Sequence, residues 1–406
     1  MNGKKVILLF LAIIVAGVLL AFSTWRHWNN NQKTILERMR PIPPIAEFNH
    51  GSSIRSIAFS PKNPDHIASA GEGNKVKVWN INNTKLPEKV LIAHPPKEGG
   101  IPLFVNFITF SPTGKWFVSN CIRKFSFWDI SSWKEINSIE IPAGDLVISP
   151  KGTYFASASN DVKLLKISDP NKVCEIILLP PKIGWESVAL EDLNIANSKS
   201  ERTIIKNQNT ITKYRNASLT QQYKAIDFSH DGKWIAAAGQ MYDFTSEKWT
   251  HKIKIWDLHR KQLFKIIERY ITEKPQTKND TNRLYQPFYS SDIRSIKFSP
   301  DNRFFAVGAR NGLTIWSIPE WNIYHEILHQ QIWDIAFSPD STMYAVTNVK
   351  GITLWSVETL TPIVLLTGSG LYGNSLIEFS PDGSTLAGGG MDGVVRLWDV
   401  RNINEK

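Results

Sequence analysis

The sequence SLIEFSPDGSTLAGGGMDGVVRLWDV, residues 375–400, reads as three short β-strands joined by tight turns. The first strand, residues 376–379, runs into Ser-Pro-Asp-Gly, a turn in which proline presets φ and glycine accepts a positive φ. An Asp392-Gly393 step joins the second strand, residues 385–389, to the third, residues 394–400. Asp-Gly between two apolar segments is a strong β-hairpin signal. The stretch therefore predicts an antiparallel sheet whose neighbouring strands follow one another along the chain.

The same pattern recurs along the chain, so internal repeats come before any other question. Each copy has an apolar residue followed by Ser, usually Ser-Pro, and later a Trp or its substitute. These two anchors lie 18–20 residues apart in six copies, and 28 apart in a copy with an insert at residues 241–251. The anchor pairs are Phe59/Trp79, Phe110/Trp128, Ile148/Lys166, Phe228/Trp256, Phe298/Trp316, Phe337/Trp355 and Phe379/Trp398.

On these residues the chain resembles the WD-repeat family of β-propellers, whose blades are about 40–45 residues long and carry a Trp-Asp signature. Trp128, Trp256 and Trp398 are each followed by Asp, and three other repeats keep only the Trp. The resemblance covers roughly residues 44–400 and implies an all-β propeller. It also implies a set of structural repeat residues: Trp79, Trp128, Trp256, Trp316, Trp355, Asp392 and Trp398.

In the family, the repeat Trp and Asp belong to a hydrogen-bond network with a strand Ser or Thr and a loop His. Only His50 stands at the family's usual distance before a first strand. The resemblance implies that His50, Ser69 and Trp79 supply three members of this network in the first blade. The usual Asp turn is replaced there by Glu-Gly-Asn, residues 72–74.

The number of blades depends on the 80 residues between the anchors Ile148 and Phe228. A worn repeat with Leu190 in place of Phe and Tyr214 in place of Trp would divide this interval into ordinary lengths of 42 and 38. Because a structureless loop of that length is uncommon in a compact domain, we expect eight blades. A seven-bladed ring with a long loop is the alternative.

A lone strand at residues 45–48 precedes the first repeat, and the last repeat lacks a strand after Trp398. In the family's ring closure, an N-terminal strand completes the last blade and removes a sheet edge. We expect the same closure in this chain.

Residues 6–22, VILLFLAIIVAGVLLAF, carry no charge and follow a short basic start. As a helix they would be about 26 Å long, close to a bilayer core of about 30 Å, and Trp25 and Trp28 stand where interfacial aromatic residues are common. We expect a single-pass N-terminal transmembrane helix. A cleaved signal peptide, with Ala21-Phe22-Ser23 as a tolerable site, and a buried soluble helix are the alternatives.

The predicted domains are a basic start and transmembrane anchor or signal peptide at residues 1–25, a polar, proline-containing linker at 26–43 and the propeller at 44–402. The chain is therefore expected at a membrane. Counting positive charges on both sides of the apolar segment leaves the side of the propeller undetermined. The order of basic residues followed by apolar residues slightly favours the exported side.

Composition is that of an ordinary globular protein, with 21 % charged and 42 % hydrophobic residues. The two cysteines form no metal-type cluster. The net charge is +10, and residues 1–41 contribute half of it through six Lys or Arg against one Glu. The remainder has no long Lys/Arg run, so we expect no nucleic-acid partner.

Three strings match catalytic or cofactor motifs, but the repeat register argues against each function. Residues 325–329, HEILH, match the zinc-protease motif. On the predicted outer strand the two His would be about 13 Å apart, whereas zinc requires bonds of about 2 Å to both. Residues 388–393 and 368–373 match G-x-G-x-x-G, but no helix follows either, so we interpret them as turn glycines. We expect no catalytic residue, cofactor or metal.

In the family, the residue four positions before the repeat Phe often faces the opening of the central channel and contacts partners. In this chain that register gives Arg55, Asn106, Gly144, Glu186 if the worn blade is real, Lys224, Arg294, Trp333 and Ser375. Three bases and one Trp stand against one acid, and Arg and Trp are enriched in interaction hot spots. We therefore expect a partner-binding site for an acidic peptide or protein surface, formed by Arg55, Asn106, Lys224, Arg294, Trp333 and Ser375.

These observations predict a membrane-tethered, non-catalytic WD-repeat scaffold for protein–protein interactions. A small-ligand receptor or enzyme that uses the central channel would require several convergent acids, His or metal ligands, whereas the predicted ring offers one acid and no His. A structural subunit of an envelope complex is a further alternative.

Overall fold

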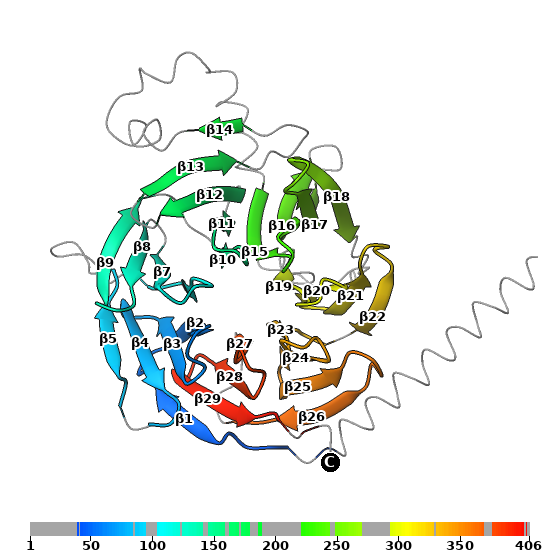
Figure 1. Ribbon diagram of the computed structural model, residues 1–406. Coiled ribbons are helices and arrows are strands. Elements are labelled where there is room, and N and C mark those ends of the chain that lie inside the picture. Colours follow the sequence, from blue (N-terminus) through cyan, green and yellow to red (C-terminus); the bar gives the residue numbers. More distant parts are fainter. Residues whose placement is uncertain are drawn as a thin grey trace, which may run out of the picture.

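The computed structural model describes residues 39, 41–83, 86–94, 104–121, 124–140, 145–158, 162–169, 172–178, 186–188, 221–243, 248–269, 293–328, 330–368, 376–401 and 403. These residues form seven antiparallel β-sheets that surround a central channel as the blades of a propeller (Figure 1). The predicted all-β propeller is confirmed. In six blades the first strand along the chain lines the channel and the later strands lie progressively further out, whereas in blade 7 β27 lines the channel and β1 is the outermost strand.

The first four blades are described here from the channel outwards. Blade 1 contains β2 (Ile54–Phe59), β3 (His66–Gly71), β4 (Lys75–Asn80) and β5 (Lys89–Ile92). Blade 2 contains β6 (Phe107–Phe110), β7 (Trp116–Cys121), β8 (Lys124–Asp129) and β9 (Lys134–Ile139). Blade 3 contains β10 (Asp145–Ile148), β11 (Tyr154–Ala158), β12 (Val162–Asp169), β13 (Lys172–Leu178) and β14 (Glu186–Val188). Blade 4 contains β15 (Gln221–Phe228), β16 (Trp234–Asp243), β17 (Lys248–Asp257) and β18 (Gln262–Arg269).

The other three blades complete the circle. Blade 5 contains β19 (Ile293–Phe298), β20 (Phe304–Ala309), β21 (Gly312–Ser317) and β22 (Ile323–Leu328). Blade 6 contains β23 (Ile335–Phe337), β24 (Met343–Asn348), β25 (Gly351–Ser356) and β26 (Pro362–Leu366). Blade 7 contains β27 (Leu376–Phe379), β28 (Thr385–Gly389), β29 (Val394–Asp399) and, as its outer strand, β1 (Ala46–Asn49).

The Ser of the recurring pattern organises the turn after each inner strand. In blade 7, Ser380 Oγ donates to the carboxylate of Asp382 at 2.5 Å and accepts the backbone N–H of Thr385 at 2.9 Å. Gly383 completes the turn with a φ of 72°. The same Ser-to-Asp hydrogen bond occurs in blades 4, 5 and 6. A short polar motif therefore fixes where the inner strand stops and the second strand starts.

The hydrophobic core lies between neighbouring blades. Trp398 and Phe379 of blade 7 share one cluster with Ile352 and Leu354 of blade 6. All six repeat Trp residues are buried, and Trp256 and Trp398 are completely so. Each Trp thus contributes a large apolar contact area where two sheets face each other, which is why one recurs in nearly every blade.

The prediction of eight blades is wrong, and the seven-bladed alternative describes the ring. Glu186, expected at the start of an extra inner strand, lies instead on β14, which pairs with the outer strand β13. The inner strands β10 and β15 are direct neighbours, because Ile226 N–H donates to the carboxylate of Asp145 at 3.0 Å. That contact leaves no room for a blade between them. Leu190 and Tyr214, the anchors of the worn repeat, lie outside the described residues.

The described residues of the insert, 241–243 and 248–251, extend the two middle strands of blade 4. β16 and β17 are ten residues long and pair from Trp234↔Asp257 to Asp243↔Lys248. The extra residues therefore lengthen the two middle strands of blade 4 beyond those of the other blades.

The N-terminal strand closes the ring as predicted. β1 pairs with β29 from Ala46↔Leu397 to Asn49↔Val394. The side chain of Phe48 is fully buried and packs 5.3 Å, between ring centroids, from Trp79 of blade 1. Closure therefore joins the start of the chain to its end and also seals the junction with the next blade.

A buried Arg holds the closing strand through charge. Arg396 on β29 is 1 % exposed, and its guanidinium donates to Glu47 on β1 at 2.9 Å and to Asp392 at 2.6 Å. Since a buried charge is stabilising only when it is paired, β29 depends on β1 for one of these partners.

The chain makes a further contact before β1. Ile42 N–H donates to the carbonyl of Leu365 at 2.9 Å, and the carbonyl of Ile42 accepts the N–H of Thr367 at 3.0 Å. This contact lies inside the predicted linker, residues 26–43, and fastens it to the outer strand of blade 6. The predicted anchor at residues 6–22 lies outside the described residues. A search of the described part of the chain finds no helix of the length and hydrophobicity that crossing a membrane requires.

Deleting residues 45–49 should destabilise the protein more than deleting residues 401–406. The first deletion opens an edge of β29, exposes the pocket of Phe48 and leaves Arg396 without Glu47. Loss of the buried Phe alone should lower the free energy of unfolding by about 3–5 kcal/mol. Thermal unfolding followed by circular dichroism measures the difference, and equal midpoints for the two truncations would contradict the closure argument.

Candidate functional site

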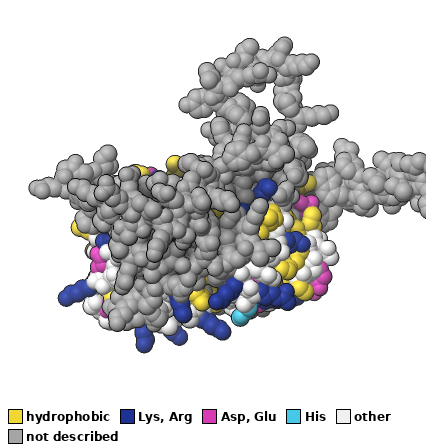
Figure 2. All heavy atoms as spheres, turned by 90° about the horizontal axis from the view of Figure 1, so that it is seen from above, with side chains coloured by type: hydrophobic (Ala, Val, Ile, Leu, Met, Phe, Trp, Pro, Cys, Tyr) yellow, Lys and Arg dark blue, Asp and Glu magenta, His cyan; other side chains and the backbone are white. Residues whose placement is uncertain are grey.

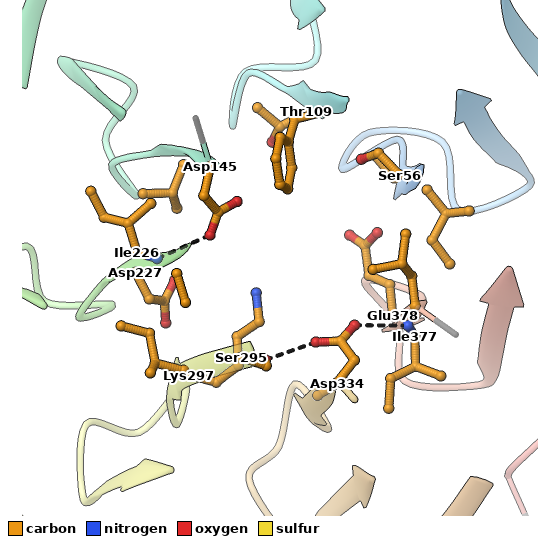
Figure 3. A pocket seen from close by; sticks show the side chains of 18 of the residues that line it. Ser56, Thr109, Asp145, Ile226, Asp227, Ser295, Lys297, Asp334, Ile377 and Glu378 are labelled. Carbon is orange, nitrogen blue, oxygen red and sulfur yellow. Dashed lines mark hydrogen bonds between the residues drawn. The ribbon is translucent and has the colours of Figure 1, made fainter. Parts of the chain in front are cut away.

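The central channel contains two cavities that share part of their lining. The outer cavity, which we call the mouth, has a volume of about 810 Å³ and lies where the inner strands start. The inner cavity has a volume of about 630 Å³. Within it, the level formed by Asp145, Asp227, Lys297, Asp334 and Glu378 is called the waist (Figure 3).

The structure brings together most of the predicted ring. Five of its members line the mouth, namely Arg55, Asn106, Lys224, Arg294 and Trp333. Ser375 and Gly144 lie outside the described residues, although the residues that follow them, Leu376 and Asp145, line this cavity. Glu186 is far from the ring because β14 is the outermost strand of blade 3. The common register places these residues together, since all inner strands start at the same end of the channel.

Polar and cation–π contacts orient the Arg side chains of the mouth. Arg55 donates to Asn106 Oδ1 at 3.3 Å and pairs with Glu72 at 3.4 Å, and its guanidinium lies 4.7 Å from the centre of the Phe104 ring. The guanidinium of Arg294 lies 3.5 Å from the ring centre of Trp333. Cation–π contacts of this kind hold a guanidinium in place without neutralising it.

The mouth is consequently positive. Arg55, Lys224 and Arg294 face Glu72, with Asp145 at the boundary to the waist. The ion pair of Arg55 and Glu72 is 42 % exposed on both sides and therefore weakly stabilising. Exchange of Glu72 for another acidic group at Arg55 would therefore cost little free energy.

The waist has the opposite character, with four carboxyl groups around one amine (Figure 3). Asp145 and Asp334 lie three positions before the repeat anchor of their strands, and Asp227, Lys297 and Glu378 lie one position before it. Alternate residues share one side of a strand, so these positions face the channel together.

The polar groups of the inner strands also connect neighbouring blades. Ile226 N–H donates to Asp145 at 3.0 Å, Phe298 N–H to Asp227 at 2.7 Å and Ile377 N–H to Asp334 at 3.0 Å. In blade 1, Ser56 Oγ accepts the N–H of Ile108 at 3.0 Å. Ser295 Oγ donates to Asp334 at 2.7 Å, and Glu378 accepts from the backbone of Phe59.

Burial shifts the titration of the waist. It raises the pKa of Asp145 to about 7 and the pKa of Glu378 to about 8. It also raises the pKa values of Asp227 and Asp334. Burial alone would lower the pKa of Lys297, but the surrounding carboxylates together raise it.

The waist corrects an argument made from the sequence. The expectation of a channel poor in acids rests on the position four before each anchor alone, whereas the acids of the waist lie three positions or one position before it. The missed signal is an Asp, Glu or Lys inside a short apolar strand, as in DLVI, AIDF, DIAF, LIEF and SIKF. Ionisable side chains are rarely placed in such strands unless they have partners.

Residues 325–328 of the HEILH string lie on the outer strand β22, as the repeat register predicts. His325 is buried and hydrogen-bonded to the hydroxyl of Tyr344 at 2.8 Å, and burial lowers its pKa to about 4. His329 lies outside the described residues. Within the described residues, no cluster of three or more His, Cys, Asp or Glu is arranged to hold a metal ion.

The glycines at 388–393 belong to the β28–β29 hairpin, where Gly393 has a φ of 75°.

The expected Trp network is present in blade 1 and recurs in blade 2. Trp79 Nε1–H donates to Ser69 Oγ at 2.8 Å, and that hydroxyl is hydrogen-bonded to His50 Nδ1 at 2.8 Å. In blade 2, Trp128 donates to Ser119 at 2.9 Å, and Ser119 lies 3.2 Å from His94 Nε2. The sequence does not predict the second network, because only His50 has the spacing that is usual in the family. Asp392 pairs with Arg396 instead of joining such a network.

Comparison with known proteins agrees with this architecture. Residues 43–80, 283–317 and 361–399 match the family described as WD domain, G-beta repeat. These segments include β1–β4, β19–β21 and β26–β29. The class of protein is therefore a seven-bladed β-propeller in which three segments match WD repeats.

Two individual proteins illustrate the similarity. The chain is 27 % identical over 139 residues to small ribosomal subunit protein RACK1 of Caenorhabditis elegans, a match that covers 32 % of this chain and 40 % of that protein. The chain thus spans less than half the length of that relative. The β-propeller domain of Cps50 (Swd1) from Myceliophteria thermophila superposes with a TM-score of 0.62 at 16 % identity, over 88 % of this chain and 99 % of that domain. This second likeness shows the fold alone.

Replacing Ser69 or Ser119 by Ala should lower the free energy of unfolding by about 1–3 kcal/mol each, because a buried indole N–H and a buried imidazole lose their shared partner. Ser126→Ala is the matched control. Ser126 is fully buried on β8, and its hydroxyl has no hydrogen-bond partner among the described residues. Denaturant unfolding compares the three variants, and equal losses in all three would show that the networks contribute nothing beyond burial.

Proposed function

We propose that this protein is a non-catalytic WD-repeat scaffold that binds a protein or peptide partner at the mouth of its channel. The observation that carries the proposal is the convergence of Arg55, Lys224 and Arg294 from three blades on one cavity of about 810 Å³. The WD-repeat matches support it, since propellers of this kind present a rigid rim to other proteins. A rigid rim costs little conformational entropy on binding.

The chemistry of the mouth favours an acidic partner with an apolar neighbouring group. Its three cations outnumber the carboxylate of Glu72. Trp333 and Leu376 add apolar area, and Met391 is 58 % exposed at its edge. Charge complementarity of this kind contributes mainly to specificity and to the rate of association.

A small-ligand receptor is the second candidate, favoured by the inner cavity. Its volume of about 630 Å³ lies in the range of small-molecule sites, and charged groups from several blades converge on it. A stoichiometric protein partner that co-purifies with the chain supports the scaffold, or a subunit of a larger complex. A titratable small ligand supports the receptor.

We further propose that residues 6–22 hold the chain at a membrane, with the exported side of that membrane slightly favoured for the propeller. Seventeen residues without charge, followed by Trp25 and Trp28, support this proposal. A tether would restrict the search for a partner to the plane of the membrane.

The double charge reversal Arg55→Glu/Arg294→Glu should weaken binding of an acidic 12-residue peptide at least about tenfold, or roughly 1.4 kcal/mol. Lys62→Glu/Lys115→Glu is the control, because these exposed lysines lie on turns at the opposite end of the inner strands. The control is needed because Lys and Arg side chains also project elsewhere on the described surface (Figure 2). Fluorescence anisotropy at low and high salt measures the affinities. A folded mouth variant with unchanged affinity would refute the proposal.

The full chain should remain in the membrane fraction after an alkaline wash, whereas a chain without residues 1–25 should become soluble. Protease treatment of intact, sealed cells then reports the side of the propeller. Cleavage before lysis indicates export, and protection that is lost on lysis indicates the opposite side. A soluble full chain would contradict the tether, and a shortened, released chain would show that residues 6–22 are a signal peptide.

A further inference from the structure

The waist connects consecutive blades through carboxyl groups that belong to one blade and accept a backbone N–H from the next. Asp145 joins blade 3 to blade 4, and Asp227 joins blade 4 to blade 5. Asp334 joins blade 6 to blade 7, and Glu378 joins blade 7 to blade 1. Since the described strands of these blades share no β-ladder, the carboxyl groups are direct polar links between inner strands.

The charges at this level do not balance. Lys297 of β19 is the cation of the waist, and it acts on all four carboxyl groups. Asp227 is 8 % exposed, and the other three carboxyl groups are half-buried. Four ionised carboxylates around one ammonium group would repel one another in a space that water screens poorly.

The other charged groups along the inner cavity lie away from this level. Arg55, Lys224 and Arg294 also line the mouth, and Arg55 and Arg294 are engaged there with Glu72 and Trp333. His230 lies on the turn after β15, six positions beyond Lys224, and acts on Asp227. The inner strands β2 and β6 contribute Ser56 and Thr109 to the waist rather than ionisable groups (Figure 3).

We propose that the waist is a proton-holding clamp, which keeps the inner strands together while some of its carboxyl groups are protonated and loosens when all of them ionise. A protonated carboxyl group still accepts the neighbouring N–H through its carbonyl oxygen. Protonation therefore removes the repulsion without breaking the link between blades.

The pKa shifts of the waist agree with this geometry, and they set the direction of the effect. Burial raises the pKa of Asp145 to about 7 and that of Glu378 to about 8, from 3.8 and 4.5. The folded protein thus binds more protons than the unfolded chain between about pH 4 and pH 8, so these groups make stability fall as the pH rises. The raised pKa of Lys297 contributes stability throughout this window.

Buried His residues have the opposite effect on the pH dependence of stability, and they act at lower pH. Burial lowers the pKa values of His50, His94 and His325 from 6.5 to about 4, so their contribution to stability increases with pH between about 4 and 6.5. The pH dependence of the unmodified protein alone is therefore ambiguous. The difference between a waist variant and the unmodified protein removes the His contribution.

The test uses Glu378→Gln and Asp145→Asn, in which an amide imitates the protonated acid. Glu358→Gln is the control, because Glu358 is exposed on a turn far from the waist. The midpoint of thermal unfolding of the full chain is measured at about pH 5.5, 7 and 8.5, in one mild detergent and at constant ionic strength. No partner is needed, so the test is independent of the proposed function.

The difference in unfolding midpoint between each waist variant and the unmodified protein should shift in favour of the variant by about 2–4 °C from the lowest to the highest pH. For the control variant this difference should not change with pH. A constant difference across the pH range would overturn the proposal. So would failure of both amide variants to fold, because the neutral side chain is the state that the proposal requires. If only one variant folds, its result decides.

Lys297→Met provides a second readout of opposite sign. Without the ammonium group, the carboxylates repel one another more strongly. The unfolding midpoint of the variant should therefore fall further below that of the unmodified protein at about pH 8.5 than at about pH 5.5. An equal loss at both pH values would show that Lys297 contributes packing rather than charge, and would overturn the proposal.

Discussion

Side-chain contacts between neighbouring blades hold this molecule together, because in the described residues the strands of each sheet pair only within that sheet. Most backbone hydrogen bonds of the described residues lie within a blade, and isolated ones, such as that from Ile54 N–H to the carbonyl of Gly390 at 3.1 Å, contribute to its position in the circle. That position depends on the apolar clusters between sheets and on the polar links of the inner strands. The pairing of β1 with β29 differs from the other strand pairs, because its backbone hydrogen bonds join the two ends of the ring.

This constraint explains the distribution of charge in the channel. A side chain that faces the channel and also reaches the next blade must accept an N–H, and a carboxyl group does this well. Carboxyl groups from several blades then meet in a narrow space, where burial raises their pKa values and Lys297 compensates part of the charge. The mouth has the larger volume, and the side chain of Arg55 there is 42 % exposed and therefore accessible. In our proposals, the waist contributes to stability and the mouth to recognition, at two different depths of one channel.

Local features of the chain were predictable wherever a short pattern has one physical solution. The turn at Ser380–Gly383, the hairpin at Gly393 and the closing strand near Phe48 follow from φ preferences and from the need to cover a sheet edge. The prediction of the blade number was wrong because the length of an interval of 80 residues is compatible both with a worn blade and with a strand added outside β13. The second Trp network was not predictable, because His94 contacts Ser119 from a position whose spacing differs from that of His50.

The sequence by itself determined the repeats, the propeller class, the closing strand and the register that gathers Arg55, Lys224 and Arg294 at one opening. Those properties depend on residues within one blade or on a common strand direction, so a linear pattern carries them. The tertiary structure alone decided that seven blades close the circle and that Asp145, Asp227, Asp334 and Glu378 meet around Lys297. Such contacts join residues up to 319 positions apart, as between Phe59 and Glu378. Their energy depends on distance and burial, which the order of residues does not contain.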